Sequence, residues 1–287
     1  METVEHAPIR TVGVIYREHT QDAAALAQAL VARLRASGRE VWTLPASREA
    51  EALGSLSATD LLIVLGGDGS IISTARLCAP AKTPILGVNF GRVGFLTELE
   101  PNEVDEKLPL YLEGDYWTDE RSMLRAACVS VTGERIPERL ALNDVVLARG
   151  AEPRLVRIHV WVDGHRYNTT IADGIIVSTA TGSTAYNLAA GGPILHPQVR
   201  SNVLTPIAPH LVADRSLILE PNAVITLELD ASGDNAILSA DGQLNDTLTP
   251  GSRVTISTSP YLARFLRRRS PTSFYRILNA KLRDNLE

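Results

Sequence analysis

The N-terminal part of the chain alternates short apolar runs with segments whose apolar residues recur at helical spacing. Residues 61–65 form a continuous apolar run that ends in glycines, as is typical of a strand buried on both faces of a parallel sheet. Residues 21–36 are rich in Ala and Leu, and Gly38 stands where a helix would end. The predicted strands are residues 11–15, 40–44, 60–65 and 83–88, and the predicted helices are residues 21–36 and 71–78. Such alternation predicts an open α/β sheet with helices on both faces.

The pattern changes after about residue 116, where short β-rich segments follow one another. Asp163-Gly164 is a two-residue turn of the kind that joins hairpin strands. The predicted strands here are residues 125–131, 140–147, 156–162, 175–177, 217–219, 224–229, 236–238 and 254–257, with helices near 183–190 and over 274–286. The expected fold is an α/β N-terminal domain with an open parallel, Rossmann-like sheet (1–120) and an all-β-rich C-terminal domain (121–270). A C-terminal helix (about 271–287) is expected to pack back on the first domain.

Composition narrows the class of protein. The 287 residues are 45% hydrophobic and 21% charged, as in ordinary soluble globular proteins. A net charge of -5 argues against a general nucleic-acid binder. Two cysteines, Cys78 and Cys128, exclude a disulfide framework and fit a reducing compartment. Because no apolar run is long enough to cross a bilayer and residues 1–10 do not resemble a signal peptide, we expect a cytoplasmic protein with no membrane partner.

A glycine-rich turn with one acid follows the buried strand. Residues 66–70 read Gly-Gly-Asp-Gly-Ser and lead into the helix predicted at 71–78. Glycines let a backbone approach a ligand closely, and a helix N-terminus suits phosphate. Asp68 would then accept a proton from a hydroxyl nucleophile or hold Mg²⁺. The alternative is a strand-to-helix turn in which Asp68 is the helix N-cap.

The densest polar stretch spans residues 172–186. It runs from Asp173-Gly174 through an apolar strand into a loop with five Ser or Thr among residues 178–184. Such a loop at a helix start can bind a polar ring or a phosphate. The alternative, a helix capped by Ser183 or Thr184, explains one hydroxyl but not five.

Two short polar segments, each with one aspartate, interrupt the β-rich part. Asn143-Asp144 falls inside an apolar strand, where a buried unpaired carboxylate would be costly. We therefore expect Asp144 to be exposed, paired or bound to a ligand, or the pair to form a bulge or turn between two short strands. Residues 241–243, Asp-Gly-Gln, form a turn-like tripeptide that says little alone.

Together these segments resemble the NAD kinase family, and the match covers most of the chain in order. Residues 66–69 look like the family's GGDG motif, which lipid kinases and phosphofructokinases share. Residues 89–97, N-F-G-R-V-G-F-L-T, resemble its N-x-G-x-x-G-F-L-T stretch, and Asn143-Asp144 resemble its Asn-Glu/Asp pair. The most specific likeness is residues 173–186 followed by Gly-Gly-Pro at 191–193, with residues 241–243 as the last short motif.

The resemblance implies transfer of phosphate from ATP, or from polyphosphate, to the 2′-hydroxyl of the adenosine ribose of NAD. Asp68 would be the catalytic base, Gly69 would line the phosphate side, and Phe95 would pack on the adenine. Asn143 and Asp144 would hold ribose hydroxyls, and Asp173 would reach the nicotinamide amide from a neighbouring subunit. The resemblance also places Thr184, Ala185, Tyr186, Asn187, Leu188, Ala189, Arg154 and Gln243 at substrate-binding positions. For Arg154 the alternative is a solvated loop charge.

The family also implies a divalent cation, Mg²⁺ carried with ATP, and a homodimer or homotetramer. Two positions depart from the family pattern: Ile171 replaces a basic residue and Ala189 replaces a serine, so contacts made by those side chains are expected to be lost. The basic cluster Arg264, Arg267, Arg268 and Arg269 is interpreted first as a solvated face. The rival functions are a diacylglycerol- or sphingosine-type lipid kinase and a non-catalytic NAD(P)-binding sensor.

Overall fold

The structure is a computed structural model that describes residues 8–92, 94–150, 154–210 and 215–284. The chain divides into two compact units, residues 1–120 with 263–287 and residues 121–262. Two long strands, β5 (Trp117–Val129) and β16 (Arg253–Arg267), each run from one unit into the other. The last strand therefore returns the chain to the first unit from residue 263 onward.

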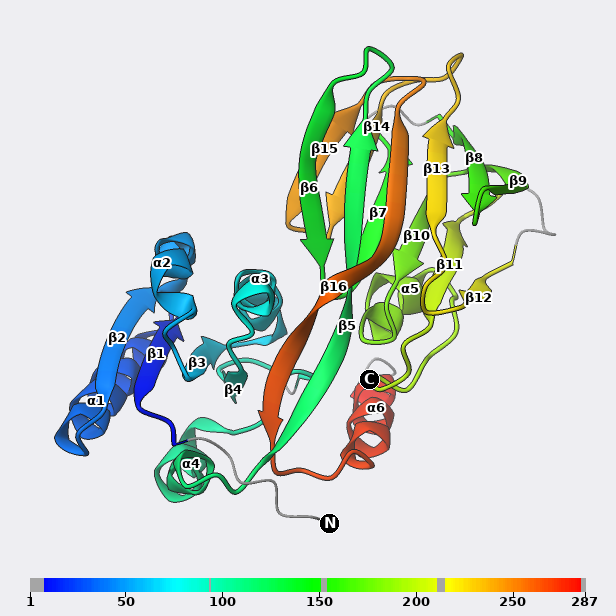
Figure 1. Ribbon diagram of the computed structural model, residues 1–287. Helices are drawn as coiled ribbons and strands as arrows, with labels where there is room; N and C mark the ends of the chain where they lie inside the picture. Colours follow the sequence, from blue (N-terminus) through cyan, green and yellow to red (C-terminus); the bar gives the residue numbers. More distant parts are fainter. Residues whose placement is uncertain (1–7, 93, 151–153, 211–214, 285–287) are drawn as a thin grey trace. The chain divides into compact units, whose positions relative to one another are not determined.

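The first unit is an α/β domain built on four parallel strands in the order β2-β1-β3-β4 (Figure 1). Its elements are β1 (Thr11–Tyr16), α1 (Gln21–Ala36), β2 (Glu40–Pro45), a 3₁₀ helix (Ala46–Ala52), α2 (Leu53–Leu56), β3 (Leu61–Gly66), α3 (Asp68–Ala81), β4 (Ile85–Asn89), a 3₁₀ helix (Pro101–Glu103), α4 (Val104–Leu112) and α6 (Ser273–Asp284). The end of β16 adds a parallel neighbour to β4 at Phe265. The chain order reverses between β1 and β3, so ligands are expected beyond the carboxyl ends of these strands.

Alternate residues of the central strand serve the two faces of this sheet. In β3, Leu61, Ile63 and Leu65 share a core with α1 and α4. The other face meets α3, since a Cβ on Gly87 of β4 would overlap the side chain of Ile71. The all-apolar sequence of β3 is thus explained by burial on both sides.

The second unit is a β-sandwich. Its elements, besides parts of β5 and β16, are β6 (Arg135–Ala141), β7 (Asp144–Arg149), β8 (Val156–Val162), β9 (His165–Ala172), β10 (Gly174–Ser178), a 3₁₀ helix (Gly182–Thr184), α5 (Tyr186–Ala189), β11 (Asn202–Ile207), β12 (Leu217–Leu219), β13 (Ile225–Leu229), β14 (Ala236–Ala240) and β15 (Leu244–Leu248). One antiparallel sheet has the order β12-β11-β10-β7-β14-β15, and the other contains β16-β13-β8-β9 with β5 and β6. Residues from both sheets form one core, such as Ile175 of β10 and Ile225 of β13.

Most of the predicted elements are present, and the differences have local causes. The hairpin at Asp163-Gly164 is confirmed, because both residues have positive φ and join β8 to β9. The prediction of one strand over 140–147 is wrong, because residues 142–143 form a turn between β6 and β7. The helix predicted near 183–190 is a 3₁₀ turn followed by the single turn α5.

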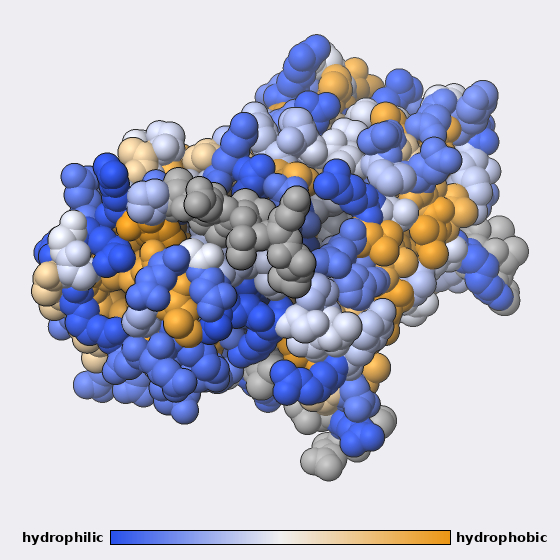
Figure 2. Space-filling model, turned by 60° about the horizontal axis from the view of Figure 1, so that its bottom comes forward, coloured by the Kyte–Doolittle hydropathy of each residue, from blue (hydrophilic) through white to orange (hydrophobic). Residues whose placement is uncertain are grey.

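The surface of the protein is mixed in character. Hydrophilic side chains dominate the face shown in Figure 2, and apolar side chains gather there in smaller groups. Within the described ranges, no helix has the length and apolar character needed to span a membrane.

The tightest packing in the first sheet surrounds Gly13 of β1. A Cβ at this position would overlap the indole of Trp42 and lie 2.6 Å from Cδ1 of Leu62. We expect Gly13→Ala to lower the free energy of unfolding by about 1–3 kcal/mol, because overpacking forces neighbouring side chains from their preferred positions. Urea unfolding measures the change. Gly54→Ala is the matched control, since nothing lies within 4 Å of its Cβ in α2 and alanine favours a helix; equal midpoints for the two variants would contradict the expectation.

Candidate active site

Asp68 is held by the backbone of a neighbouring loop. Gly67 is the N-cap of α3, and Asp68 is the first residue of that helix, so the N-cap alternative for Asp68 is wrong. Its two carboxylate oxygens accept hydrogen bonds from the backbone N–H groups of Phe95 (2.9 Å) and Leu96 (3.0 Å). The carboxylate is therefore fixed in position and orientation at the carboxyl end of β3. Its side chain remains 26% exposed.

The glycines around Asp68 fall into two kinds. A Cβ on Gly94 would overlap Oδ1 of Asp68, so only glycine permits the loop to approach the carboxylate this closely. Around Gly67 and Gly69, by contrast, a Cβ would meet nothing within 4 Å. The backbone at the start of α3 therefore faces open space, where the N-terminus of a helix can receive an anionic ligand. In the motif predicted at residues 89–97, Val93 lies outside the described residues.

The C-terminal helix brings a cation to this carboxylate. Nζ of Lys281 in α6 lies 3.9 Å from Oδ2 of Asp68 and 4.7 Å from the ring centroid of Phe95. The ring of Phe95, predicted to pack on adenine, lies 5.8 Å from that of Phe274, also in α6. Sequence reasoning did not single out Lys281, because a lysine in an amphipathic C-terminal helix carries no motif. The same contacts confirm that the C-terminal helix packs on the first domain.

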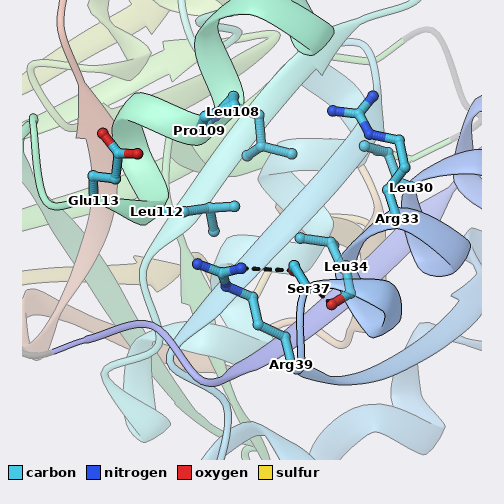
Figure 3. Close-up of a pocket in the computed structure, with 9 residues that line it drawn as sticks. All are labelled: Leu30, Arg33, Leu34, Ser37, Arg39, Leu108, Pro109, Leu112 and Glu113. Atoms are coloured by element: carbon cyan, nitrogen blue, oxygen red, sulfur yellow. Dashed lines mark hydrogen bonds between the residues drawn. The ribbon is translucent and has the colours of Figure 1, made fainter.

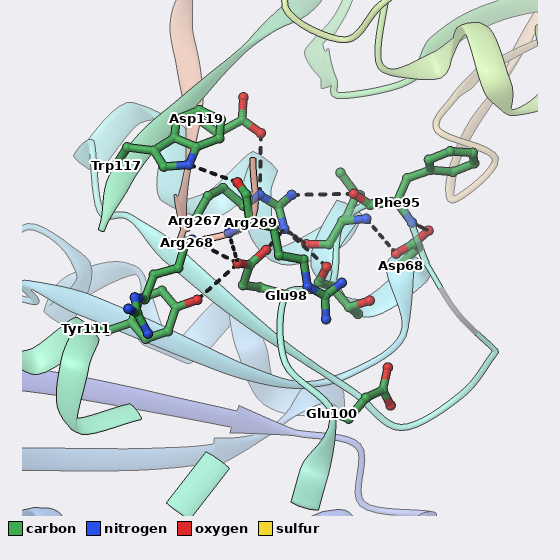
Figure 4. A network of polar contacts seen from close by, with 12 residues as sticks. Asp68, Phe95, Glu98, Glu100, Tyr111, Trp117, Asp119, Arg267, Arg268 and Arg269 are labelled. Carbon is green, nitrogen blue, oxygen red and sulfur yellow. Dashed lines mark hydrogen bonds and ion pairs between the residues drawn. The ribbon is translucent and has the colours of Figure 1, made fainter. Parts of the chain in front are cut away.

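The basic cluster near the end of β16 is not a uniform solvated face. Arg267 has only 6% of its surface exposed and forms ion pairs with Glu98 (3.2 Å) and Asp119 (3.4 Å) (Figure 4). The solvated-face interpretation is wrong for this residue. Arg264, Arg268 and Arg269 are partly exposed and pair with Glu120, Asp115 and Glu103, respectively.

In the second unit, Asp241 fixes the Asn143-Asp144 turn. Its carboxylate accepts hydrogen bonds from the N–H groups of Leu142 (3.0 Å), Asn143 (2.7 Å) and Asp144 (3.2 Å). Asp241 has a φ of 54°, in the left-handed region that Asp tolerates in turns. The Asp-Gly sequence indicated a turn, but nothing in it pointed to residues about a hundred positions earlier.

Asp144 is buried beside this carboxylate. Only 4% of its surface is exposed, so of the alternatives predicted for this pair exposure is excluded, whereas the turn between two short strands, β6 and β7, is present. Burial, followed by repulsion from Asp241, raises the pKa of Asp144 to about 7. Near neutral pH the side chain can therefore exist with or without its proton.

Hydrogen bonds within the second unit hold the hydroxyl-rich loop in shape. Each of its five side-chain hydroxyls has a partner inside the second unit; these hydroxyls belong to Ser178, Thr179, Thr181, Ser183 and Thr184. The N-cap of α5 is Ala185, with no side-chain cap hydrogen bond, so the prediction of Ser183 or Thr184 as the cap is wrong. The loop packs against the turn, since Thr179 N donates to Asn143 O at 2.8 Å. Most of these hydroxyls therefore shape the loop.

The predicted residues after this loop differ in exposure. The ring of Tyr186 is 45% exposed, which leaves it available to a ligand, while Ala185 and Leu188 are half-buried and Ala189 is exposed. Asn187 is fully buried, and its amide group binds Ser183 O, Pro193 O and the Thr205 hydroxyl. Asn187 thus holds the loop in shape.

Three other predicted residues lie elsewhere in this unit. Asp173 lies at the opposite end of β10 from the hydroxyl loop, because it precedes the first residue of this strand, whereas the loop begins at the last, Ser178. The Asp173 carboxylate accepts from Nε of Arg149 at 2.7 Å. The side chain of Arg154 is 76% exposed, and its Nη1 lies 3.6 Å from Oδ2 of Asp234. Gln243 is exposed in the turn after β14.

A separate pocket of about 230 Å³ lies between α1 and α4 (Figure 3). Leucines and Pro109 line it together with Arg33 and Arg39, and both arginines already have partners in the chain, Asp105 and Ser37. None of the motif residues lines this pocket. It lies on the α1 and α4 face of the sheet, whereas α3 covers the opposite face.

The described side chains do not form a ready metal site. Among residues 8–92, 94–150, 154–210 and 215–284, no three His, Cys, Asp or Glu residues are grouped so that they could hold a metal ion. These residues therefore do not fit a metal held by the protein alone.

Comparison with known proteins decides the family. Residues 21–116 match the family model of the ATP-NAD kinase N-terminal domain, and residues 142–268 match that of the C-terminal domain. The chain belongs to the NAD kinase family. The resemblance seen in the motifs is therefore confirmed. The comparisons give no support to a lipid kinase or a non-catalytic sensor.

Relatives in this family span nearly the whole chain. The NAD kinase of Dehalococcoides mccartyi strain CBDB1 is 38% identical over 97% of this chain and 98% of its own length. That of Heliobacterium modesticaldum is 39% identical over 95% of this chain and 98% of its own length. These relatives identify the chain as a phosphotransferase of the NAD kinase family.

Solved structures of the NAD kinase family share the fold. Yeast NADH kinase complexed with NADH gives a TM-score of 0.85 at 24% identity, covering 95% of this chain and 87% of that one. An Archaeoglobus fulgidus NAD kinase in complex with ATP gives 0.75 at 27% identity, covering 95% and 98%. The two-part fold, with an α/β domain and a β-rich domain, is thus confirmed.

The contact between Gly94 and Asp68 can be tested by adding one methyl group. We expect Gly94→Ala to lower kcat about 10²-fold, because a displacement near 1 Å disturbs the geometry of a reacting group. Steady-state NADP formation measures the effect. Gly91→Ala in the same loop is the control, since its Cβ would have only Asn89 Oδ1 nearby, at 3.9 Å. Equal kcat values for the two variants would show that the close approach does not matter.

The buried Asp144 makes stability depend on pH. Its pKa is about 7 in the folded protein, against about 3.9 in an unfolded chain. Between these values the folded state binds more protons, so the free energy of unfolding falls as pH rises from about 4 to about 7. Asp144→Asn removes this pH dependence. The free energy of unfolding of the variant, relative to that of the unchanged protein, should therefore rise by up to about 4 kcal/mol between pH 4 and pH 8. Urea unfolding across this range tests it, and parallel pH profiles would contradict it.

Proposed function

We propose that this NAD kinase transfers the γ-phosphoryl group of ATP to the 2′-hydroxyl of the adenosine ribose of NAD, with Asp68 as the general base. The single observation that carries this role is the carboxylate of Asp68, held by the N–H groups of Phe95 and Leu96 at the open start of α3. A carboxylate oxygen has lone pairs left after accepting one such bond, so it can still take a proton.

The chemistry requires this kind of base. A ribose hydroxyl attacks poorly while it keeps its proton, and a positioned carboxylate removes that proton as the O–P bond forms. The bond between the γ-phosphorus and the bridging oxygen breaks, and ADP leaves. The N–H groups at the start of α3, including that of Gly69, would face the phosphates, since the glycine turn leaves space there. Mg²⁺ bound to the ATP phosphates would offset their charge.

The dinucleotide would be held by the turn and loop of the second unit. Asn143 and Asp144 would bind ribose hydroxyls, with their backbone fixed by Asp241. The exposed ring of Tyr186, with Thr184, Ala185, Leu188 and Ala189, would form the wall for adenine and ribose. Phe95 would contact the adenine, and Arg154 and Gln243 remain proposed contacts.

Asp173 would serve a neighbouring copy of the chain. Its position at the opposite end of β10 from the hydroxyl loop supports a contact with a ligand other than the one proposed beside Asn143. A homodimer or homotetramer, as the family suggests, would supply that neighbour. The oligomeric state, the cytoplasmic location and the use of polyphosphate in place of ATP stay predictions.

The role of Asp68 has a direct test. We expect Asp68→Asn to lower turnover by about 10²–10⁴-fold while NAD still binds, because the amide keeps the shape but cannot accept the proton. NADP formation with ATP measures turnover, and calorimetry measures NAD binding. Asp105→Asn is the matched control, because this carboxylate is 79% exposed on α4.

Parallel assays separate the rival functions. Wild-type protein should phosphorylate NAD but neither diacylglycerol nor sphingosine. Unchanged turnover in Asp68→Asn would remove Asp68 from the mechanism, whereas NAD binding without turnover in the unchanged protein would favour a sensor.

A further inference from the structure

Arg267 forms hydrogen bonds to the loop that binds Asp68. Its guanidinium group donates to the carbonyl oxygens of Leu96 (2.9 Å), Thr97 (3.2 Å) and Phe95 (3.5 Å). The N–H groups of Phe95 and Leu96 are the same two that bind the carboxylate of Asp68. The carbonyl groups of this short segment thus bind Arg267, while two of its N–H groups bind the carboxylate of the proposed base (Figure 4).

Buried carboxylates hold the arginine in turn. Glu98 and Asp119, each 2% exposed, lie 3.2 and 3.4 Å from the guanidinium group. Glu98 also accepts from the hydroxyl of Tyr111 and from the N–H groups of Arg268 and Arg269. The guanidinium group therefore has little freedom to move, because buried carboxylates and backbone carbonyls bind it from several sides.

The side-chain chemistry explains why an arginine stands here. A guanidinium group offers five N–H donors in a rigid plane, which can serve three carbonyls and two carboxylates together. A lysine has three donors at one point and cannot span the same set. The arrangement therefore uses the shape of the group as well as its charge.

We propose that Arg267 is a positioning residue for catalysis, which acts by fixing the backbone of Phe95 and Leu96 so that the N–H groups of these two residues aim the Asp68 carboxylate. This proposal rests on the function proposed for Asp68. Arg267 lies 199 positions after Asp68 in the sequence and outside the family's short motifs noted above. Arg267 does not contact Asp68 but reaches it through the loop. The Phe95 carbonyl and the Leu96 N–H belong to one peptide group, and the Leu96 carbonyl belongs to the next.

A double-mutant cycle tests this proposal. Arg267→Lys is made in the unchanged protein and in the Asp68→Asn background, and kcat is expressed per folded protein, with the folded fraction taken from circular dichroism. We expect Arg267→Lys alone to lower kcat about 10–10²-fold with KM for NAD nearly unchanged, because the base is misaligned while NAD still binds. In the Asp68→Asn background the same change should alter residual kcat less than about twofold, because no base remains to be aimed.

Two further variants keep the test decisive. Arg264→Lys, on the same strand and paired with Glu120 near the surface, is the matched control and should leave kcat unchanged. Glu98→Gln loosens the arginine without removing it and should reproduce the kcat loss and its dependence on Asp68.

The outcomes distinguish failure of the positioning role of Arg267 from failure of the proposed role of Asp68. An equal loss of kcat in both backgrounds, an effect mainly on KM, or a normal kcat in Arg267→Lys would overturn the positioning role. So would failure of both Arg267→Lys and Glu98→Gln to fold, since the network would then serve the fold alone. A normal kcat in Asp68→Asn by itself would instead overturn the role of Asp68.

Discussion

The site in the first unit depends on the pair of hydrogen bonds from Phe95 and Leu96 to the carboxylate of Asp68. A carboxylate at the first position of a helix is free to rotate unless something fixes both of its oxygens. Two adjacent N–H groups do so, but only if the loop comes very near, and Gly94 is the residue that allows it. The glycine turn, which carries Asp68, and the loop after β4, which binds its carboxylate, therefore form one structural unit, hereafter the device that orients Asp68. Orientation of a reacting group contributes much of the rate in an enzyme, so the device suits a catalytic base.

In the second unit, hydrogen bonds from backbone N–H groups to a carboxylate fix a turn of the backbone. There the carboxylate of Asp241 receives three N–H groups and fixes the turn that carries Asn143 and Asp144. In the first unit the backbone positions the carboxylate proposed as the base, whereas in the second a carboxylate positions the backbone. The cost falls on Asp144, which is buried near a like charge and whose pKa rises to about 7. The contacts that make the turn rigid therefore also keep Asp144 partly protonated near neutral pH.

The elements that sequence reasoning predicted well are those whose pattern is local. The apolar run of β3 and the Asp163-Gly164 turn depend on neighbouring residues alone, and both are present. α4 was not predicted, and α3 continues beyond its predicted end at residue 78. Proline disfavours helix interiors, yet each helix accommodates one in its last turns, Pro109 and Pro80. Packing outweighs propensity there.

The parts of the site that sequence reasoning missed are non-local. The motif around Asp68 can be read from a few adjacent letters, but the support for its carboxylate includes Arg267 and Lys281 from the end of the chain. Nothing in the letters around Arg267 distinguishes it from Arg268, and only the fold buries one and exposes the other. The contact between Arg267 and Leu96 spans 171 positions, so the loop gains this partner only after the rest of the chain has folded back. The geometry of the proposed base is thus completed by the last strand and helix, which explains how a short motif can identify the chemistry without containing what aligns it.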